Sequence, residues 1–449
     1  MIYAFFKILI RSALKIYFRN IHVVGTENIP KEGPFLVVSN HPSSFLDPIS
    51  IGVWVNQRMS FLAKATMFDN KIIGSILKKF NMIPIYRAED NPLLLNKNEE
   101  VFKACYTKLS NKGVIMMFPE GTSESERRLR KIKTGAARIA LGTSKENNFN
   151  LNVKIVPVGL NYTKSSRFRS ELYIQFGIPL KTKDYIENFK KDEVLTSKTL
   201  TADIEKRIKR LIIDIDKKEY EVLVKRVESL YKSHLLKSLP KNDQAVFTNI
   251  RVSKGIYEAI KCFQKDDAEH FNQMKTKIDD YFLNLNSLKL SDKTIEKGGQ
   301  LSNILQYFIK SIVILVIGFP IWLFGYINSF IPYRIPRLIA LKITDSEAFY
   351  GALLMSIGSL SFILFYSLTT YLAWEITHSS FFTTCYGIAL PLSGFFTIFY
   401  ARIARRFYYN WQFISKFFSK QKVLIQLMND RNNIIKELEI IAEKFKPSL

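Results

Sequence analysis

The chain has 449 residues, 47% of them hydrophobic, and carries a formal charge of +25 at neutral pH. This length allows one large domain with additional parts, and the hydrophobic content excludes a disordered chain. The positive charge and the 35 phenylalanines suit an anionic partner and a lipid environment. We predict no nucleic-acid binding, because zinc-binding Cys/His clusters, RNA-binding aromatic signatures and dense basic blocks are all missing from the sequence. The three widely separated cysteines predict buried thiols rather than disulfides or a metal site.

Residues 1–20 predict an amphipathic basic helix. Lys7, Arg11, Lys15 and Arg19 recur every four residues among Ile, Phe, Leu and Tyr. Charges in the middle of the stretch argue against a cleaved signal peptide and against a spanning segment, and they favour a helix in the membrane interface. A surface helix packed on the following domain is the alternative.

Residues 21–215 alternate short apolar runs with stretches of helix length, which predicts an α/β domain with a mostly parallel sheet flanked by helices. The predicted strands are 35–38, 59–63, 82–85, 114–118, 153–158 and 172–176. Five of these runs end close to a polar residue, namely His41, Lys64, Arg87, Glu120 and Asn161. Because ligands bind at the carboxyl ends of parallel strands, these side chains are expected to converge on one crevice.

The strongest candidate for chemistry is His41, which follows the first apolar run and precedes Asp47 by six residues. Pro42 suits the first position of a new helix. Positions six apart lie ~240° around a helix, so His41 and Asp47 meet only if His41 sits on the turn before it. An imidazole oriented by a carboxylate can take a proton from a hydroxyl, which makes these two residues a predicted catalytic pair. A polar turn with a capping histidine is the alternative.

Two later runs end in groups that suit an anionic ligand. Arg87 has a planar fork that fits a phosphate, Gly121 permits close approach of a ligand, and the Thr122 hydroxyl can donate to an anionic oxygen. The cations between Arg127 and Lys133 could face headgroups or donor phosphates. The alternatives are a surface ion pair for Arg87, a helix-capping turn at Thr122 and a solvated basic face for residues 127–133.

These segments resemble the glycerolipid acyltransferase family, which includes lysophosphatidate and glycerol-3-phosphate acyltransferases. Its four motifs occur here in order at residues 40–47, 82–87, 118–123 and 155–159. The resemblance implies transfer of a fatty acyl group from acyl-CoA or acyl-carrier protein to glycerol-3-phosphate or its 1-acyl derivative, without metal or bound cofactor. It implies that His41 is the general base and Asp47 its partner. It also implies that Arg87, Glu120, Gly121 and Thr122 position the acceptor, with Lys64 and Lys133 as further anionic contacts.

The chain departs from the common family pattern at two positions. Five residues separate His41 from Asp47, whereas most of the family has four, and this spacing resembles the eukaryotic glycerol-3-phosphate and dihydroxyacetone-phosphate branch. Ser123 stands where many members carry an arginine. Backbone N–H groups near the first motif are expected to stabilise the oxyanion of the reaction. The alternatives are acylation of another lysophospholipid, transacylation, or a non-catalytic lipid-binding membrane protein on the same fold.

The second half of the chain predicts membrane attachment. Residues 216–300 read as a charged helical region, residues 301–401 as a membrane region, and residues 402–449 as a basic helical tail that pairs with itself or with the charged region. The apolar segments 348–374 and 379–400 are long enough to span a bilayer. Basic residues flank both outer ends, which predicts an integral membrane protein with its catalytic domain on the cytoplasmic face. Gly318 to Pro320 interrupts segment 311–331, so a re-entrant segment is favoured over a spanning one. The oligomeric state is left open.

Overall fold

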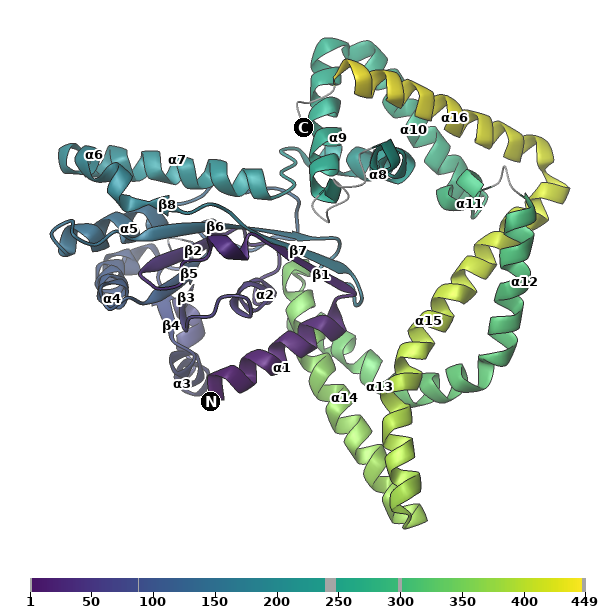
Figure 1. Ribbon diagram of the computed structural model, residues 1–449, viewed down its shortest axis with the longest axis horizontal. Coiled ribbons are helices and arrows are strands. Elements are labelled where there is room, and N and C mark those ends of the chain that lie inside the picture. The colour runs from purple at the N-terminus through teal and green to yellow at the C-terminus, as the bar shows by residue number, and fades with distance from the viewer. Residues whose placement is uncertain (1, 88, 239–247, 298–300, 446–449) are drawn as a thin grey trace. The chain divides into compact units, whose positions relative to one another are not determined.

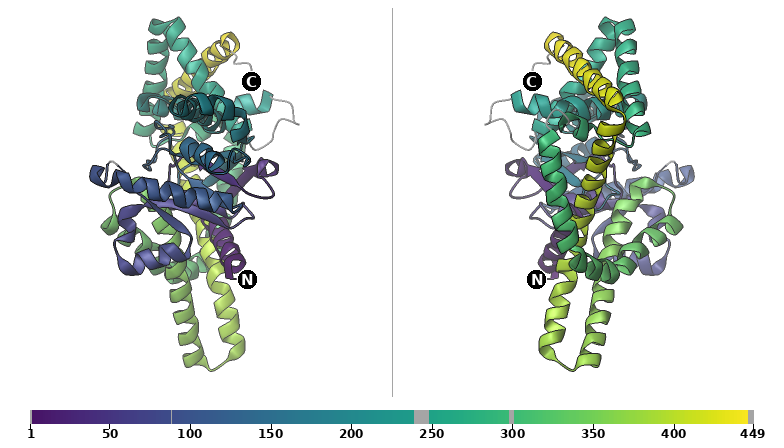
Figure 2. Two further views of the ribbon diagram at one scale, coloured as in Figure 1. Left: turned by 90° about the vertical axis from the view of Figure 1, so that its left-hand side faces the viewer. Right: turned by 90° about the vertical axis from the view of Figure 1, so that its right-hand side faces the viewer.

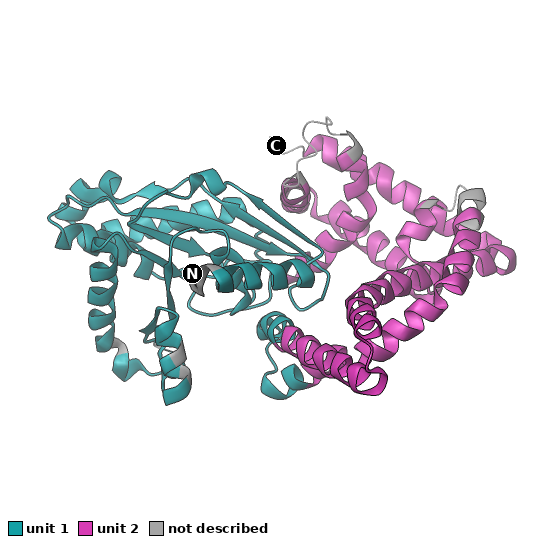
Figure 3. Ribbon diagram, turned by 60° about the horizontal axis from the view of Figure 1, so that its bottom comes forward, with its two compact units in different colours: residues 1–216, 339–356 teal, residues 217–338, 357–449 magenta. Residues whose placement is uncertain are grey.

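The computed structural model describes residues 2–87, 89–238, 248–297 and 301–445. The chain forms two compact units (Figure 3). The first contains residues 1–216 and 339–356, and the second contains residues 217–338 and 357–449.

In its described residues, the first unit is built around a mixed sheet of eight strands (Figure 1). They are β1 (Asn20–Val24), β2 (Phe35–Ser39), β3 (Met59–Lys64), β4 (Met82–Ile85), β5 (Val114–Met117), β6 (Lys154–Tyr162), β7 (Glu171–Phe176) and β8 (Leu180–Lys181). The order is β1-β7-β6-β2-β5-β3-β4, with β8 beside β6. Strands β2 to β6 are parallel, whereas β7 and β8 run antiparallel to β6. The predicted mostly parallel α/β fold is confirmed, and β1 and β8 are additional strands.

Helices cover both faces of this sheet (Figure 1). They are α1 (Ile2–Tyr17), α2 (Leu46–Gly52), α3 (Lys71–Lys79), α4 (Asn98–Ser110), α5 (Gly135–Glu146), α6 (Ile186–Lys191), α7 (Glu193–Leu211) and the beginning of α14 (Glu347–Thr377), with short 3₁₀ turns η1 (Thr26–Asn28), η2 (Ala65–Phe68), η3 (Pro92–Lys97) and η4 (Thr182–Tyr185). Strand β2 lies between β5 and β6, and all five of its residues are buried. Its side chains alternate between two cores. Leu36 and Val38 face α5 and α7, whereas Phe35 and Val37 face α1 and α2.

Helix α1 combines the two alternatives drawn from its sequence. Leu14 and Tyr17 are buried in the core of the domain, and Lys7 donates to the Val55 carbonyl at 2.7 Å. Other apolar side chains on the helix, including Phe5 (64% exposed) and Ile8 (67% exposed), lie outside the core. The helix therefore packs on the domain and still presents an apolar face that suits a membrane interface.

The second unit is helical. Its elements are α8 (Lys218–Ser238), α9 (Thr248–Asp266), α10 (Ala268–Ser287), α11 (Asp292–Lys297), α12 (Leu301–Ile317), most of α13 (Phe319–Ile343), the remainder of α14, α15 (Ser380–Ser419) and α16 (Gln421–Lys444). The pairing of the basic tail with the charged region is present, because α16 packs on α8, α9, α10 and α11, and α16 also contacts α15. Buried Arg431 of α16 pairs with buried Asp292 of α11 at 2.8 Å. The prediction of three buried thiols holds only for Cys105, because Cys262 and Cys385 are exposed on α9 and α15.

Among the described residues, α14 and α15 are long and apolar enough to cross a membrane, and they run side by side within the second unit (Figure 2). Helix α15 continues without a break from the apolar segment into the basic tail as far as Ser419. A third candidate is the pair α12 and α13, which is bent by 62° at Gly318. Pro320 has no N–H to continue the hydrogen-bond ladder, and the Leu315 carbonyl at the break accepts from Tyr400 at 2.8 Å. The interruption that the sequence predicts is present, and whether this pair spans or re-enters stays a prediction.

Candidate active site

The loop after β2 brings His41 and Asp47 together. Nδ1 of His41 lies 2.8 Å from Oδ2 of Asp47. Helix α2 begins only at Leu46, so His41 is on the preceding turn, as the sequence analysis requires for contact. Pro42 lies within this loop and not at the first helical position, which corrects one prediction.

The loop between His41 and Asp47 contains an unusual backbone conformation. Ser44 has a positive φ of 42°, a value that L-residues other than glycine adopt rarely. Its N–H donates to Oγ of Ser123 at 2.7 Å. The two features that the sequence analysis singles out, the five-residue spacing and Ser123, therefore contact each other.

Asp47 is completely buried and receives three hydrogen-bonding groups. Its Oδ2 accepts from the Ser43 N–H at 2.7 Å as well as facing His41, and its Oδ1 accepts from the Tyr162 hydroxyl at 2.8 Å. Burial raises the pKa of the Asp47 carboxyl, and these hydrogen bonds offset part of that rise. An ionised carboxylate can only accept hydrogen bonds, so Nδ1 of His41 carries the proton of this contact. Nε2 is left as the basic nitrogen.

The His41 ring lies parallel to the ring of Phe118, with centroids 3.9 Å apart and an interplanar angle of 10°. The side chain is 18% exposed, so the imidazole is covered on one face and still reachable by a substrate. The main-chain N–H of His41 donates to Oε1 of Glu120 at 2.7 Å. Backbone, ring plane and Nδ1 of this residue are thus each fixed by a separate contact.

Glu120 is buried and holds the loop between His41 and Asp47 in place. Its Oε1 accepts from His41, and its Oε2 accepts from the N–H of Arg130 at 3.0 Å. Burial raises the pKa of its carboxyl, and the two backbone donors lower it in part. The sequence analysis expects Glu120 to position the acceptor. In the structure its two oxygens accept from the main-chain N–H groups of His41 and Arg130, so Glu120 holds the His41 backbone, and a contact with the acceptor stays a prediction.

The three predicted cations lie at the carboxyl ends of β3, β4 and the loop after β5, and each is paired with a carboxylate. Arg87 binds Asp90 through two nitrogens, at 2.7 and 2.9 Å, and also donates to the Gly121 carbonyl. Lys64 pairs with Asp90 at 2.9 Å, and Lys133 pairs with Glu89 at 2.6 Å. The hydrogen bonds from Arg87, and then those from Lys64, lower the pKa of Asp90 to about 2. Three cations against two carboxylates leave this cluster with an excess of positive charge.

Gly121 and Thr122 form the turn next to these cations. Gly121 has a positive φ of 74°, and a Cβ there would lie 2.9 Å from Nζ of Lys133. The positive φ favours glycine at this position, whereas the Lys133 side chain could move away from a Cβ. Within the described residues the Thr122 hydroxyl has no hydrogen-bond partner, which leaves it open to a ligand.

Tyr162 and Phe118 are site residues that sequence reasoning missed. Asn161, which was expected in the crevice, instead donates to the Leu211 carbonyl at the end of α7 and accepts from the Ile213 N–H just after this helix. Because side chains alternate along β6, the neighbouring residue Tyr162 points to the opposite face and reaches Asp47. Tyr162 could have been predicted from this alternation, because it follows the apolar run of β6 and points to the face opposite to that of Asn161.

The oxyanion donors expected near the first motif are mostly engaged. The N–H groups of His41, Ser43 and Ser44 donate to Glu120, Asp47 and Ser123, respectively. Pro42 has none. In this loop the Phe45 N–H has no acceptor within the described part of the chain, which makes it the remaining candidate.

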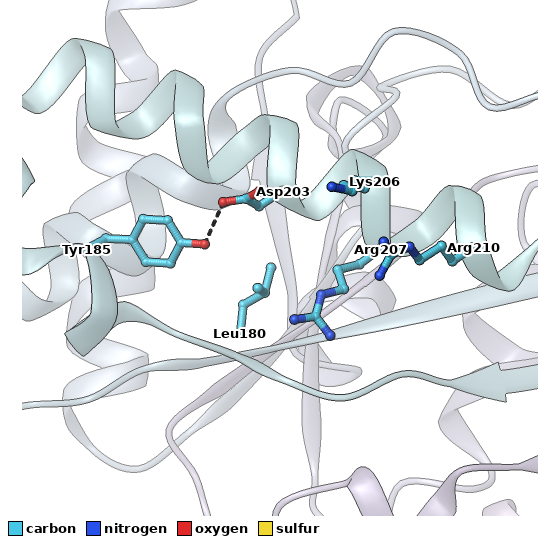
Figure 4. A pocket seen from close by; sticks show the side chains of 6 residues that line it. All are labelled: Leu180, Tyr185, Asp203, Lys206, Arg207 and Arg210. Carbon is cyan, nitrogen blue, oxygen red and sulfur yellow. Dashed lines mark hydrogen bonds between the residues drawn. The ribbon is translucent and has the colours of Figure 1, made fainter.

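A polar pocket of about 230 Å³ lies elsewhere on the first unit (Figure 4). It is lined by Leu180, Tyr185, Asp203, Lys206, Arg207 and Arg210. Leu180 of β8 pairs with Ile155 near the amino end of β6, whereas His41 follows the carboxyl end of β2. The pocket is therefore separate from the catalytic loop. Among the residues that the structure describes, no group of three His, Cys, Asp or Glu side chains could hold a metal ion.

Comparison with known proteins gives similarities to acyltransferases. Residues 20–161 match the family model described as Acyltransferase. The chain is 23% identical over 319 residues to glycerol-3-phosphate O-acyltransferase 1 of Saccharomyces cerevisiae, covering 52% of this chain and 42% of the relative. It is 30% identical over 132 residues to 1-acyl-sn-glycerol-3-phosphate acyltransferase of Bacillus subtilis, covering 29% and 58%. The chain spans about half the length of the curated relatives it matches. A solved structure, the 1-acyl-sn-glycerophosphate acyltransferase PlsC from Thermotoga maritima, is 20% identical with a TM-score of 0.32, covering 44% of this chain and 73% of that chain.

Proposed function

We propose that this protein is an O-acyltransferase of phospholipid synthesis, because residues 20–161 match the Acyltransferase family model and the chain is similar to glycerol-3-phosphate and 1-acylglycerol-3-phosphate acyltransferases. It moves a fatty acyl group from acyl-CoA or acyl-carrier protein to glycerol-3-phosphate or 1-acylglycerol-3-phosphate. The observation that carries the proposal is the His41–Asp47 contact of 2.8 Å, with Nε2 as the basic nitrogen of a partly exposed ring. No metal or bound cofactor takes part in the proposed reaction.

The reaction begins with proton transfer from the acceptor hydroxyl to Nε2 of His41. The hydroxyl oxygen forms a bond to the thioester carbonyl carbon, and the resulting oxyanion is stabilised by N–H donors such as that of Phe45. When the oxyanion collapses, the C–S bond breaks and the departing sulfur takes the proton from the imidazolium. Asp47 keeps the proton of the neutral ring on Nδ1 and stabilises the positive charge of the imidazolium that forms after proton transfer.

The acceptor phosphate is proposed to bind at Arg87 and Lys64, where it replaces Asp90 as their anionic partner. A guanidinium donates to phosphate as a planar fork, so Arg87 supplies most of this contact. Thr122, whose hydroxyl has no protein partner in the described residues, is an additional donor to the acceptor.

Arg87→Ala is expected to raise the KM for glycerol-3-phosphate roughly tenfold to a hundredfold, as for loss of a charged hydrogen bond worth about 1.5–3 kcal/mol. The change in kcat is expected to be smaller, because the Arg87 side chain bonds Asp90 and the Gly121 carbonyl and not the His41 ring. Initial rates at varied acceptor concentration measure this split. Lys206→Ala, which removes a cation from the separate polar pocket, is the control. An unchanged KM in Arg87→Ala would remove Arg87 from the phosphate site.

Tyr162→Phe is expected to move the acid limb of the rate profile to higher pH. Burial already raises the pKa of the Asp47 carboxyl. The variant removes the hydrogen bond from Tyr162 to Oδ1, and this loss raises the pKa further. The acid limb therefore moves in the direction of the raised Asp47 pKa. Activity is lost as pH falls through the raised pKa and is recovered above it. A profile of kcat/KM against pH tests the prediction, and an acid limb at the wild-type position would show that the hydroxyl does not support the anion.

The protein is proposed to work as an integral membrane enzyme whose catalytic unit faces the cytoplasm. The apolar lengths of α14 and α15 support membrane insertion, and the basic residues outside both ends support this orientation. Acceptor and donor are soluble or interfacial anions, and the product is a membrane lipid, which suits an active site at the membrane surface.

An acceptor panel with purified protein and one labelled acyl-CoA tests the proposed function. Glycerol-3-phosphate, dihydroxyacetone phosphate, lysophosphatidate and lysophosphatidylcholine are compared, with His41→Ala as the blank. Transfer to the phosphate-bearing glycerol acceptors is the expected result. Labelling of lysophosphatidylcholine alone would favour the other lysolipid class, and labelling of no acceptor above the blank would favour a non-catalytic lipid-binding protein.

A further inference from the structure

The first ten residues of α14 belong to the first unit (Figure 3). They contact the loop that carries the proposed catalytic pair. We propose that this segment, residues 347–356, is a positioning element of the active site that holds the Ser43–Leu46 loop and, through it, Asp47. A helix with the length of a membrane span thereby becomes part of the support of the catalytic base. The catalytic consequence of this contact depends on the proposed function, whereas the contact itself does not.

Ser43 joins α14 to the catalytic carboxylate. Its N–H donates to Oδ2 of Asp47 at 2.7 Å, and its hydroxyl donates to the Ala348 carbonyl at 3.3 Å. Both bonds are buried. Any displacement of the first turn of α14 therefore acts on the same residue that donates to Asp47.

Side-chain packing fixes the same segment on the loop. Ala348, Gly351, Ala352 and Met355 are the buried residues of α14. Their spacing of three and four places them on one face of the helix. Ala352 and Met355 belong to the same core cluster as Leu46. The rings of Phe349 and Phe45 meet edge to face at 6.0 Å beside this contact.

At Gly351 the backbone of α14 comes very close to Ser43, Leu46 and Ser165. A Cβ at this position would lie 2.8 Å from the Ser165 carbonyl oxygen, 2.9 Å from Cδ2 of Leu46 and 3.1 Å from Oγ of Ser43. The first neighbour is main chain and cannot rotate away, so even a methyl group requires the helix or the loop to move. The contact therefore depends on the absence of a side chain at residue 351.

The length of α14 leaves this segment available for docking. The helix has 31 residues, of which 347–356 lie in the first unit. The remaining stretch, 357–377, is about 21 residues or ~32 Å long, enough to cross a hydrocarbon core of ~30 Å. The docked residues are thus not needed for the span.

The test compares Gly351→Ala with Gly358→Ala in the full-length protein. Both changes give the same helix a residue of higher propensity. A Cβ at residue 358 would meet only Cγ of Pro336 at 3.7 Å, an ordinary contact. Any difference between the two variants therefore reports the contact at residue 351 and not the stability of the helix.

Gly351→Ala is expected to lower kcat roughly tenfold or more, because small misplacements of catalytic groups carry large rate effects. It is also expected to move the acid limb of the profile of kcat/KM against pH to higher pH, because a weaker bond from the Ser43 N–H raises the pKa of Asp47. Loss of folded protein would instead lower the rate equally at all pH values. Hydrogen exchange of the amides in residues 41–47 is expected to be faster than in the wild type. Gly358→Ala is expected to match the wild type in all three.

Unchanged exchange in Gly351→Ala would overturn the docking contact whatever reaction the protein catalyses. Faster exchange with a wild-type kcat and pH profile would overturn the positioning role, as would a rate loss equal at every pH. If the wild type acylates no acceptor, the proposed function fails, and the exchange comparison still decides whether α14 holds the loop.

Discussion

His41→Ala is expected to reduce the rate of acyl transfer at least about a hundredfold, and by up to ~10⁴-fold, the range of a positioned general base. The variant removes Nε2, the basic nitrogen of the His41–Asp47 pair. It also removes the ring that lies on Phe118. Acceptor binding is expected to change less than kcat, because the proposed phosphate contacts Arg87 and Lys64 are kept. Single-turnover rates with labelled acyl-CoA and glycerol-3-phosphate measure the chemical step without the contribution of product release.

The matched control is His22→Ala, which removes a histidine of β1 in the same unit. The His22 ring stacks on Tyr173 and has no contact with the catalytic loop among the described residues. This variant is expected to keep the wild-type rate. A rate for His41→Ala within a factor of ten of the wild type would assign the base to another group.

The fold could be predicted because its signals are local. Each buried parallel strand is a short apolar run, and β2 shows this pattern with all five residues buried. The geometry of His41 and Asp47 could be predicted as well, since positions six apart on a helix point in different directions. The start of α2 could not, because the loop is held open by contacts of Ser44 with Ser123 and of Ser43 with Asp47. Pro42 alone carries no information about those partners.

The contacts of Glu120 and the pairing of the cations could not be predicted from the sequence. Glu120 bonds two main-chain groups from loops that lie 79 and 10 residues away along the chain. Arg87 and Lys64 share Asp90, and only the adjacent ends of parallel β3 and β4 bring the three together. A list of motif residues gives the types of side chain present, whereas tertiary contacts decide which of them face the substrate and which face one another.

Asp47→Asn is expected to lower kcat by roughly 10²–10⁴-fold and, at the same time, to raise thermal stability. The amide oxygen can accept from Ser43 and from Nδ1 of His41, as Oδ2 does in the wild type. The amide NH₂ then faces Tyr162, whose hydroxyl can accept from it and donate to Ser50, 3.3 Å away. The geometry is kept, and the negative charge that stabilises the imidazolium is lost.

The gain in stability follows from burial. The Asp47 carboxyl has a raised pKa in the folded protein, mainly because burial disfavours its charged form. Above that pKa the ionised carboxylate therefore opposes folding, and this opposition disappears as pH falls and the group takes up a proton. Asparagine removes the cost at every pH, so the melting temperature of the variant is expected to exceed that of the wild type by a few degrees at neutral pH, by the usual scaling of about 2–4 °C per kcal/mol.

Thermal melts of both proteins in one detergent, from neutral to acid pH, measure this difference, which is expected to shrink as pH falls. Asp203→Asn is the control, because that carboxylate accepts from Tyr185 at 2.7 Å as Asp47 does from Tyr162, but lies in a part-buried pocket away from the loop. A lower melting temperature for Asp47→Asn at neutral pH would mean that the charged hydrogen bonds outweigh the cost of burial. The contact between the carboxylate and the imidazole would then stabilise the folded protein as well as support the reaction. The burial of the Asp47 charge would not lower the stability of the folded protein overall.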